Sequence, residues 1–336
     1  MARIGVIGSG SWGTAVSHLL SENGHHLTVW SYLQEETDMF LKNHENTDKL
    51  PGVKLPEDMQ FTCDLEEAAS GKDLLVFVVP SPVVRSTAKN LAPFVKEGAK
   101  IVSLAKGIEE QTLMTMSDII EENIPQADVA VLSGPSHAEE VGRDLPTTIV
   151  TGAHSKKTAE YIRSIFMSPV FRVYTSSDML GIQIGGALKN VIALAAGIAD
   201  GIGYGDNTKA ALITRGSTEI SRIGTAMGAN PKTLFGLSGI GDLIVTCASV
   251  HSRNRKAGYL IGQGYSMDDA MKEVHQIVEG VYSAKAGRKL SKKYHVETPI
   301  IECVNRVLFE NMPARDAVNE LMLRQGKDEL ENEEDW

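Results

Sequence analysis

The segment from Met179 to Ala199 restricts the fold of this chain more than any other part of the sequence. It reads MLGIQIGGALKNVIALAAGIA, and Lys189 is its one ionisable residue. A helix of this composition must be surrounded by lipid or by protein, because almost none of its surface is polar. A lysine at its centre, many glycines and alanines, and the absence of aromatic or basic flanks disfavour a membrane helix. The sequence therefore predicts a buried core helix and no membrane span.

Lys189 can be interpreted in two ways. Gly185, Gly186, Ala193 and Ala196 lie three, four or seven positions away and share its helix face. Such a face allows a ligand or a backbone to come close, and burial lowers the pKa of an amine toward values used in acid–base chemistry. Alternatively, the lysine extends to the surface of a core helix and has no chemical role. On this segment alone, both interpretations stay open.

Upstream of this helix, short apolar segments alternate with helical ones. The apolar segments predict strands at Arg3–Ile7, His26–Trp30, Asp73–Val79, Ala99–Leu104, Val129–Ser133, Thr147–Thr151 and Val170–Tyr174. The stretch Asn46–Asp58 has the composition of a loop. Near-continuous apolar strands separated by helices are typical of a mostly parallel sheet covered by helices. Residues 1–177 are therefore expected to form a Rossmann-like α/β domain.

Downstream of residue 177 the strand signals stop. Helices are expected at 179–199, 208–227, 231–236, 240–248, 253–262, 267–274, 280–294, 299–310 and 314–325. Residues 178–327 are therefore expected to form an all-α domain, followed by an acidic tail at 328–336.

Charge and cysteine content narrow the class of protein. The formal net charge is −10, and without the six acids of Asp328–Asp335 it is about −4, which argues against nucleic-acid binding. The tail itself is expected to be solvated and disordered. Cys63, Cys247 and Cys303 are scattered without a CxxC pair, which suggests reduced thiols and no zinc site. Because the N-terminus also lacks the layout of a signal peptide, we expect a cytoplasmic protein.

A glycine motif follows the first predicted strand. Gly8-Ser9-Gly10-Ser11-Trp12-Gly13 is a GxGxxG that opens a helix, which is the context a dinucleotide-binding loop needs. An acid is expected about twenty residues further on, at the end of the second strand, but Ser31-Tyr32 stand there. Without that acid a 2′-phosphate becomes acceptable, and no arginine selects for it. We therefore expect NAD(P), with NADP slightly favoured.

Polar residues also follow other strands, where ligands of such sheets bind. They are Pro80-Ser81, Lys106-Gly107, and the run Gly134-Pro135-Ser136-His137-Ala138. Lys106 is expected beside cofactor and substrate, although it could be a solvated lysine. For His137 a surface or helix-capping role is favoured over acid–base chemistry.

The second half contains residues suited to anions. Asp242 follows a glycine turn and could orient a lysine, or could simply begin a helix. His251-Ser252-Arg253-Asn254-Arg255 offers two arginines and a helix N-terminus to a phosphate, but could equally be a solvated helix start. Glu279 could reach a ribose or cap a helix.

With these motifs the chain resembles the bacterial type of the NAD(P)-dependent glycerol-3-phosphate dehydrogenase family. The matching stretches are GSGSWGTA (8–15), VVPS (78–81), AKGIE (105–109), SGPSHAEEV (133–141), GGALKNVIALAAGIADGIGYGDNTKAALITRG (185–216), GLSGIGDLIVTC (236–247), SRNR (252–255) and VEG (278–280). They follow one another along nearly the whole chain. The implied fold is a Rossmann-like domain with an all-α C-terminal domain of the 6-phosphogluconate dehydrogenase C-terminal-like type.

The resemblance also implies roles for individual residues. Lys189 matches the proton donor and acceptor, Asp242 its carboxylate partner, and Lys106 a residue that touches both substrate and cofactor. The substrate contacts would be Gly134, Ser136, Lys189, Asp242, Ser252, Arg253 and Asn254, and the cofactor contacts Ser11, Trp12, Tyr32, Ala138, Arg253, Ile277 and Glu279, beside the glycines Gly8, Gly10 and Gly13. Tyr32 replaces the His or Arg that relatives often carry, which puts its help with a 2′-phosphate in doubt.

The implied reaction is the reversible reduction of dihydroxyacetone phosphate to sn-glycerol 3-phosphate, which would supply glycerophospholipid synthesis. The implied partners are this small substrate and NAD(P), with no metal, and a homodimer is compatible with the resemblance. Two alternatives are another two-domain dehydrogenase of the β-hydroxyacid type and a non-catalytic NAD(P)-sensing protein. The anion-binding stretch and Asp242 argue against the first. A sensing protein would need no aligned lysine, carboxylate and phosphate site, and it would need a partner-binding element, but the sequence contains no basic recognition helix.

Overall fold

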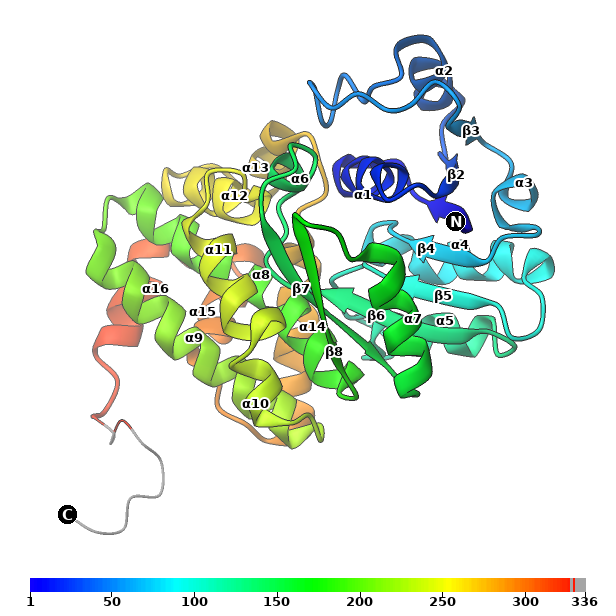
Figure 1. Ribbon diagram of the computed structural model, residues 1–336. Coiled ribbons are helices and arrows are strands. Elements are labelled where there is room, and N and C mark those ends of the chain that lie inside the picture. Colours follow the sequence, from blue (N-terminus) through cyan, green and yellow to red (C-terminus); the bar gives the residue numbers. More distant parts are fainter. Residues whose placement is uncertain (327–328, 330–336) are drawn as a thin grey trace.

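The computed structural model of the protein describes residues 1–326 and residue 329. The acidic tail predicted for 328–336 lies outside the described residues, except for Glu329. Figure 1 shows a half built around a sheet, blue to green, packed beside a half built from helices, green to red. The sheet ends at Ser176 and the long helix α8 begins at Met179.

The sheet confirms the predicted mostly parallel architecture. Its strands are β1 (Arg3–Ile7), β2 (His26–Trp30), β3 (Gln60–Thr62), β4 (Leu74–Phe77), β5 (Lys100–Ser103), β6 (Asp128–Ser133), β7 (Thr147–Ala153) and β8 (Phe171–Ser176). Their order is β3-β2-β1-β4-β5-β6-β7-β8, and every neighbouring pair is parallel except β6 and β7. In the register, Ile7 pairs with Trp30 and with Phe77, so the carboxyl ends of β2, β1 and β4 lie at one level.

Helices cover both faces of this sheet. One face packs against α1 (Ser11–Glu22), α2 (Gln34–Asn43) and α7 (Lys156–Phe166), and the other against α3 (Leu65–Ala69), α4 (Val84–Leu91) and α5 (Met116–Asn123). Successive strand residues point to opposite faces, so Val76 enters the first core and Phe77 the second. Because both faces of the sheet are buried, its strands need continuous apolar sequence. This explains why the strands could be predicted from the sequence.

The helical half surrounds α8 (Met179–Ile202). Its other helices are α9 (Asp206–Ala226), α10 (Pro231–Leu234), α11 (Asp242–Ala248), α12 (Arg253–Gly262), α13 (Met267–Val274), α14 (Glu279–Tyr294), α15 (Pro299–Phe309) and α16 (Ala314–Met322). The carboxylate of Asp178 accepts the Gly181 N–H at 2.9 Å and caps the start of α8, and Gly203 ends it at φ 95°. By length and composition α8 could cross a membrane, but its apolar window is 100% buried in the protein. The predicted core helix is therefore confirmed.

Glycines on two helices bring α8 and α12 unusually close together. A Cβ added at Gly197 would lie 2.1 Å from the Arg255 carbonyl oxygen, and one at Gly258 would lie 2.2 Å from the Leu194 carbonyl oxygen. Gly201 and Gly262 repeat this contact one turn further along each helix. On this part of α8, the small residues therefore make room for the backbone of another helix. This packing holds α12 against α8.

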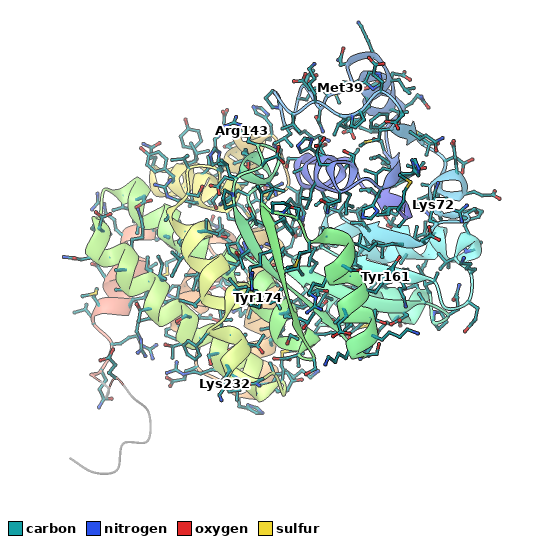
Figure 2. All side chains as sticks on the ribbon, in the orientation of Figure 1. Met39, Lys72, Arg143, Tyr161, Tyr174 and Lys232 are labelled. Atoms are coloured by element: carbon teal, nitrogen blue, oxygen red, sulfur yellow. The ribbon has the colours of Figure 1, made fainter. Side chains whose placement is uncertain are left out.

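One edge of the sheet is formed by β8, which carries exposed polar and aromatic side chains. On β8, the Arg172 guanidinium lies over the Tyr174 ring at 5.1 Å, and Tyr174 is exposed on the edge strand (Figure 2). Charged and bulky side chains on an edge strand discourage pairing with a further strand. The ligand-binding features lie elsewhere, at the carboxyl ends of the strands.

Candidate active site

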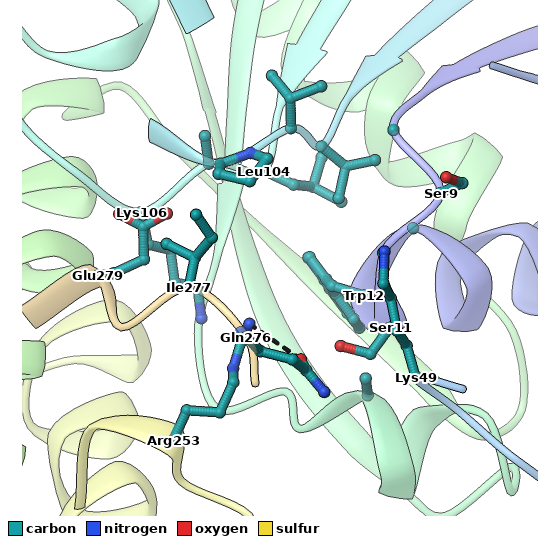
Figure 3. A pocket seen from close by; sticks show the side chains of 18 of the residues that line it. Ser9, Ser11, Trp12, Lys49, Leu104, Lys106, Arg253, Gln276, Ile277 and Glu279 are labelled. Atoms are coloured by element: carbon teal, nitrogen blue, oxygen red, sulfur yellow. Dashed lines mark hydrogen bonds between the residues drawn. The ribbon is translucent and has the colours of Figure 1, made fainter. Parts of the chain in front are cut away.

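One cavity of about 1210 Å³ lies between the carboxyl ends of the strands and the helical half. All the residues to which the family resemblance assigns a role line it except Gly134: Gly8, Gly10, Ser11, Trp12, Gly13, Tyr32, Lys106, Ser136, Ala138, Lys189, Asp242, Ser252, Arg253, Asn254, Ile277 and Glu279. Figure 3 shows Ser11 and Trp12 on one side and Lys106, Arg253, Ile277 and Glu279 on the other. The fold thus collects residues that are more than 250 positions apart in the sequence.

Each of the three glycines in the glycine loop has a different structural role. Gly8 has φ +125°, and a Cβ there would lie 2.9 Å from the Val78 backbone. A Cβ at Gly13 would lie 2.1 Å from the Gly8 carbonyl oxygen, so this glycine lets α1 pack onto β1. Gly10 precedes α1, and no atom of the described residues lies within 4 Å of an added Cβ there. That open space at a helix N-terminus suits a pyrophosphate.

The end of the cavity beyond β2 holds a carboxylate that the sequence did not reveal. Tyr32 is 81% exposed at this end. Glu36, in the first turn of α2, accepts hydrogen bonds from the Ser9 and Ser31 hydroxyls at 2.7 and 2.8 Å and is paired with Lys49. These bonds and the Lys49 charge lower the pKa of Glu36 against the opposing effect of burial, which is the largest single influence. Glu36 and Lys49 both line the cavity.

At the other end, one buried carboxylate lies between two lysines. Asp242, 2% exposed, accepts the Lys106 ammonium on Oδ2 at 2.7 Å and lies 3.2 Å from the Lys189 Nζ through Oδ1. Lys189 also donates to the Thr246 hydroxyl at 2.7 Å, and that hydroxyl donates to the Asp242 carbonyl at 2.6 Å. Thr246 was not expected from the sequence. The cluster carries two positive charges and one negative charge when both amines are protonated.

Close backbone packing places these three side chains. A Cβ at Gly185 would lie 2.6 Å from the Ser238 carbonyl oxygen, so α8 lies against the π-helical turn Leu237–Gly241. Asp242 follows that turn as the first residue of α11. Such π turns frequently occur at functional sites. From the sheet side, Lys106 donates to the Gly134 carbonyl at 2.9 Å, so Gly134 contacts the cluster although it does not line the cavity.

Burial makes Lys189 a weak base. The net pKa of Lys189 is lowered to about 8: desolvation is the largest cause and the Lys106 charge adds to it, whereas the charge and hydrogen bond of Asp242 act in the opposite direction. A lysine with this pKa can both give up and take back a proton near neutral pH. The amine is only 5% exposed, and it opens onto the cavity.

The expected capping role of His137 is wrong, and its partly exposed side chain lines the cavity. It precedes α6 (Ala138–Val141), but its side chain makes no capping hydrogen bond, and its buried Nε2 has no hydrogen-bond partner among the residues that the structure describes. The ring lies 6.0 Å from the His251 ring, and both histidines line the cavity. Burial is the main cause that lowers the pKa of His137, followed by the Lys189 charge. Its polar neighbours in sequence suggested exposure, and Ser136, His137 and Glu139 are in fact partly exposed.

The anion-binding stretch begins α12, with one correction. Ser252 caps the helix by accepting the Arg255 N–H at 3.2 Å, and Arg253 is exposed and donates to Gln276 at 3.3 Å (Figure 3). Arg255 does not line the cavity, because Asp200 holds its guanidinium at 2.7 Å. The expectation that both arginines face a phosphate is therefore wrong for Arg255. Spacing alone could not reveal its partner on α8.

Asn254 and Glu279 join parts of the fold as well as lining the cavity. The Asn254 amide donates to the Asn190 side chain at 3.0 Å and accepts the Gly280 N–H at 2.8 Å, which links α12 to α8 and α14. The Glu279 carboxylate accepts the Ser81 N–H at 2.9 Å and the Ser81 hydroxyl. Burial raises the pKa of Glu279, and the Ser81 hydrogen bonds oppose that rise. Glu279 thus connects the helical half to the loop after β4.

The sheet order identifies the class of protein. The series β3-β2-β1-β4-β5-β6 is the order of dinucleotide-binding sheets, with its glycine loop after β1. Across the cavity from that loop lies a lysine with a lowered pKa beside a carboxylate. This combination defines a nicotinamide-dependent dehydrogenase.

The comparisons with known proteins narrow the class to one family. Family models described as the N-terminus and the C-terminus of NAD-dependent glycerol-3-phosphate dehydrogenase match residues 3–159 and 178–319. The chain therefore belongs to the NAD-dependent glycerol-3-phosphate dehydrogenase family.

Individual relatives cover nearly the whole chain. A protein of Agathobacter rectalis named glycerol-3-phosphate dehydrogenase (NAD(P)+) is 64% identical over 97% of this chain and 97% of its own length. A protein of the same name from Fusobacterium nucleatum is 59% identical over 99% of this chain and 100% of its own. The crystal structure of glycerol-3-phosphate dehydrogenase from Coxiella burnetii superposes with a TM-score of 0.93 at 33% identity, covering 96% of this chain and 99% of that one.

Proposed function

We propose that this protein catalyses the reversible, NAD(P)H-dependent reduction of dihydroxyacetone phosphate to sn-glycerol 3-phosphate. The family and the names of its relatives support the reaction. The observation that carries the proposal is the position of Asp242 between Lys106 and Lys189, at the end of a cavity that also contains a dinucleotide loop.

Lys189 is proposed as the proton donor in the reduction and the acceptor in the oxidation. Bound NAD(P)H supplies the hydride, and reduction places negative charge on the carbonyl oxygen of the substrate. The protonated amine of Lys189 stabilises that charge and then gives up its proton. Two of its hydrogens are engaged by Thr246 and Asp242, which leaves the third for the substrate oxygen. General acid catalysis of this kind contributes roughly 10²–10⁴-fold to the rate.

Asp242 and Lys106 are proposed to position the Lys189 amine and to set the charge around it. Asp242 holds the Lys189 ammonium in place and offsets part of its desolvation. Lys106 shares the carboxylate, so the cluster keeps a net positive charge and attracts an anionic substrate. Gly134 and Ser136 complete this side, and the Ser136 hydroxyl donates to the Gly134 carbonyl at 2.9 Å.

The beginning of α12 is proposed to hold the phosphate of the substrate. Ser252, Arg253 and Asn254 line the cavity at a helix N-terminus, where N–H groups and the helix dipole favour an anion. A guanidinium can hold two phosphate oxygens at once. Binding energy gained at the phosphate positions the carbonyl at the distant reacting end.

We propose that residues 1–177 supply most of the contacts to NAD(P), and that residues 178–327 supply Lys189 and most of the contacts to the substrate. The cofactor residues would be Gly8, Gly10, Ser11, Trp12, Gly13, Tyr32, Lys106, Ala138, Arg253, Ile277 and Glu279. The open space at Gly10 and the position of Ser11 and Trp12 at the start of α1 support this assignment.

The test is steady-state oxidation of NADH and of NADPH by the purified protein with dihydroxyacetone phosphate. Turnover that requires the phosphorylated ketone is expected. Turnover with hydroxy acids instead would favour a β-hydroxyacid dehydrogenase, and tight NAD(P)H binding without any turnover would favour a sensing protein.

We also propose a cellular location and a metabolic role for the protein. The free thiols Cys63, Cys247 and Cys303 support a reducing, cytoplasmic compartment, and the product would supply glycerophospholipid synthesis. That the protein forms a homodimer stays a prediction. Sedimentation equilibrium would measure its oligomeric state directly.

A further inference from the structure

The cavity contains a carboxylate at the place where the sequence lacked one. In dinucleotide-binding sheets an acid at the end of the second strand bonds the 2′-hydroxyl of the adenosine ribose. Here β2 ends at Trp30 and is followed by Ser31 and Tyr32. The carboxylate of Glu36 reaches back to this position from α2, because its Oε2 accepts both the Ser31 and the Ser9 hydroxyls.

The same carboxylate carries a counter-charge. Lys49, from the loop between α2 and β3, binds the other oxygen of Glu36 with its Nζ. The two side chains are partly exposed, 20% for Glu36 and 34% for Lys49, and both line the cavity. Figure 3 shows Lys49 on the same side as Ser9, Ser11 and Trp12, opposite Lys106 and Glu279. An acid and a base that are bound to each other therefore face the ribose end of the cofactor site.

We propose that the Glu36–Lys49 pair determines the choice between NADH and NADPH. Glu36 serves a ribose with a free 2′-hydroxyl, and Lys49 serves a ribose with a 2′-phosphate. This inference rests on the proposed cofactor role of the glycine loop. It assigns the specificity of the site to two residues that neither the GxGxxG motif nor the family motifs include.

The pair explains acceptance of both cofactors. With NADH bound, Lys49 stays on Glu36 and neutralises it, and a Glu36 oxygen can accept the 2′-hydroxyl. With NADPH bound, Lys49 turns from Glu36 to the phosphate, because a phosphate carries more charge and three acceptor oxygens. Glu36 keeps its bonds to Ser9 and Ser31 and opposes the phosphate. A single ammonium set against a nearby carboxylate gives a weak preference, whereas an arginine fork without the acid would give a strong one.

Equilibrium binding of NADH and NADPH to the full chain tests the proposal. Trp12 and Trp30 line the cavity, so quenching of protein fluorescence reports binding without turnover. In Lys49→Met we expect the Kd for NADPH to rise roughly tenfold, with the Kd for NADH within about twofold of the wild type. In Glu36→Gln we expect the Kd for NADPH to fall and the Kd for NADH to rise, so that the ratio moves roughly tenfold in the opposite direction.

Two matched controls separate the pair from general charge. Glu35→Gln makes the same change one residue away on α2, and Lys42→Met the same change in its last turn; both side chains are exposed and neither lines the cavity. Neither control should move the ratio of the two Kd values. An unchanged ratio in both Lys49→Met and Glu36→Gln, or an equal shift in the controls, overturns the inference. Failure of the wild type to bind either coenzyme overturns the cofactor proposal itself.

Discussion

The two ends of the cavity use the same chemical pair, a lysine and a carboxylate, in opposite ways. At the substrate end Asp242 is almost fully buried and shared by two lysines, so the cluster keeps an unbalanced positive charge. At the ribose end Glu36 and Lys49 are partly exposed and balance each other. Burial strengthens a charge interaction and shifts the pKa of its members, whereas exposure weakens both effects. The first arrangement suits proton transfer, and the second suits a choice between two ligands.

The strongest way to break this comparison is to remove the buried amine. Lys189→Ala is expected to lower kcat by roughly 10²–10⁴-fold, because the general acid is lost. NADH binding should stay within about twofold of the wild type, since the glycine loop is untouched, and thermal unfolding should remain cooperative. Lys232→Ala, which removes an exposed lysine of α10, is the control. Near-normal turnover in Lys189→Ala would remove this lysine from the chemistry.

Removing the shared carboxylate should have the next largest effect. Asp242→Asn leaves two neighbouring ammonium groups without their counter-charge, so the pKa of Lys189 should fall further below about 8. We expect the reduction rate at neutral pH to fall on the order of 10²-fold, because less amine is protonated and its position is lost. Lowering the pH should recover part of the rate. If acid brings no recovery, Asp242 acts by another route.

The pH dependence sharpens the contrast between the ends. The pKa of Lys189 is lowered to about 8, so the amine is protonated below that pH and neutral above it. The kcat/KM for reduction should therefore fall as the pH rises through about 8, by roughly tenfold per unit at the limit, and that for oxidation should rise to a plateau. Steady-state rates in both directions across this range measure it. Parallel profiles in the two directions would contradict the assignment.

The smallest of these effects is expected at the phosphate. Arg253→Ala should raise KM for dihydroxyacetone phosphate by roughly tenfold and change kcat less, because an exposed guanidinium contributes binding more than chemistry. Its neighbour Arg255 offers the matched control, since Asp200 holds it away from the cavity. Arg255→Ala should alter stability rather than KM. A KM unchanged by loss of Arg253 would exclude that residue from the phosphate site.

Most of the fold could be predicted because its signals are local. Continuous apolar runs predicted seven of the strands to within a few residues, and the composition around Lys189 predicted α8. The strand β3 was not predicted, because Gln60–Thr62 is too short to show a pattern. The antiparallel pairing of β7 with β6 could not be predicted either, since the pattern of apolar residues in a strand does not encode the direction of its neighbour.

The cofactor and substrate sites were predictable where a motif names the residues, and not where tertiary contacts choose them. Lys189, Asp242 and Lys106 belong to readable stretches, and the fold brings them together. Glu36 was missed because the acid was sought directly after β2, whereas it arrives from the next helix. Lys49 lies in a stretch read as a loop, and only the folded chain places it on Glu36.

The close packing of α8 against α12 has a consequence for how tolerance to mutation should be interpreted. At Gly197, Gly201, Gly258 and Gly262 an added methyl group would meet backbone at 2.1 to 2.3 Å, and backbone cannot swing aside as a side chain can. A saturation mutagenesis screen should therefore find these positions as intolerant as Lys189, although none of them lines the cavity. Expression level would separate the two groups, because a packing glycine fails through misfolding and a catalytic lysine fails while folded.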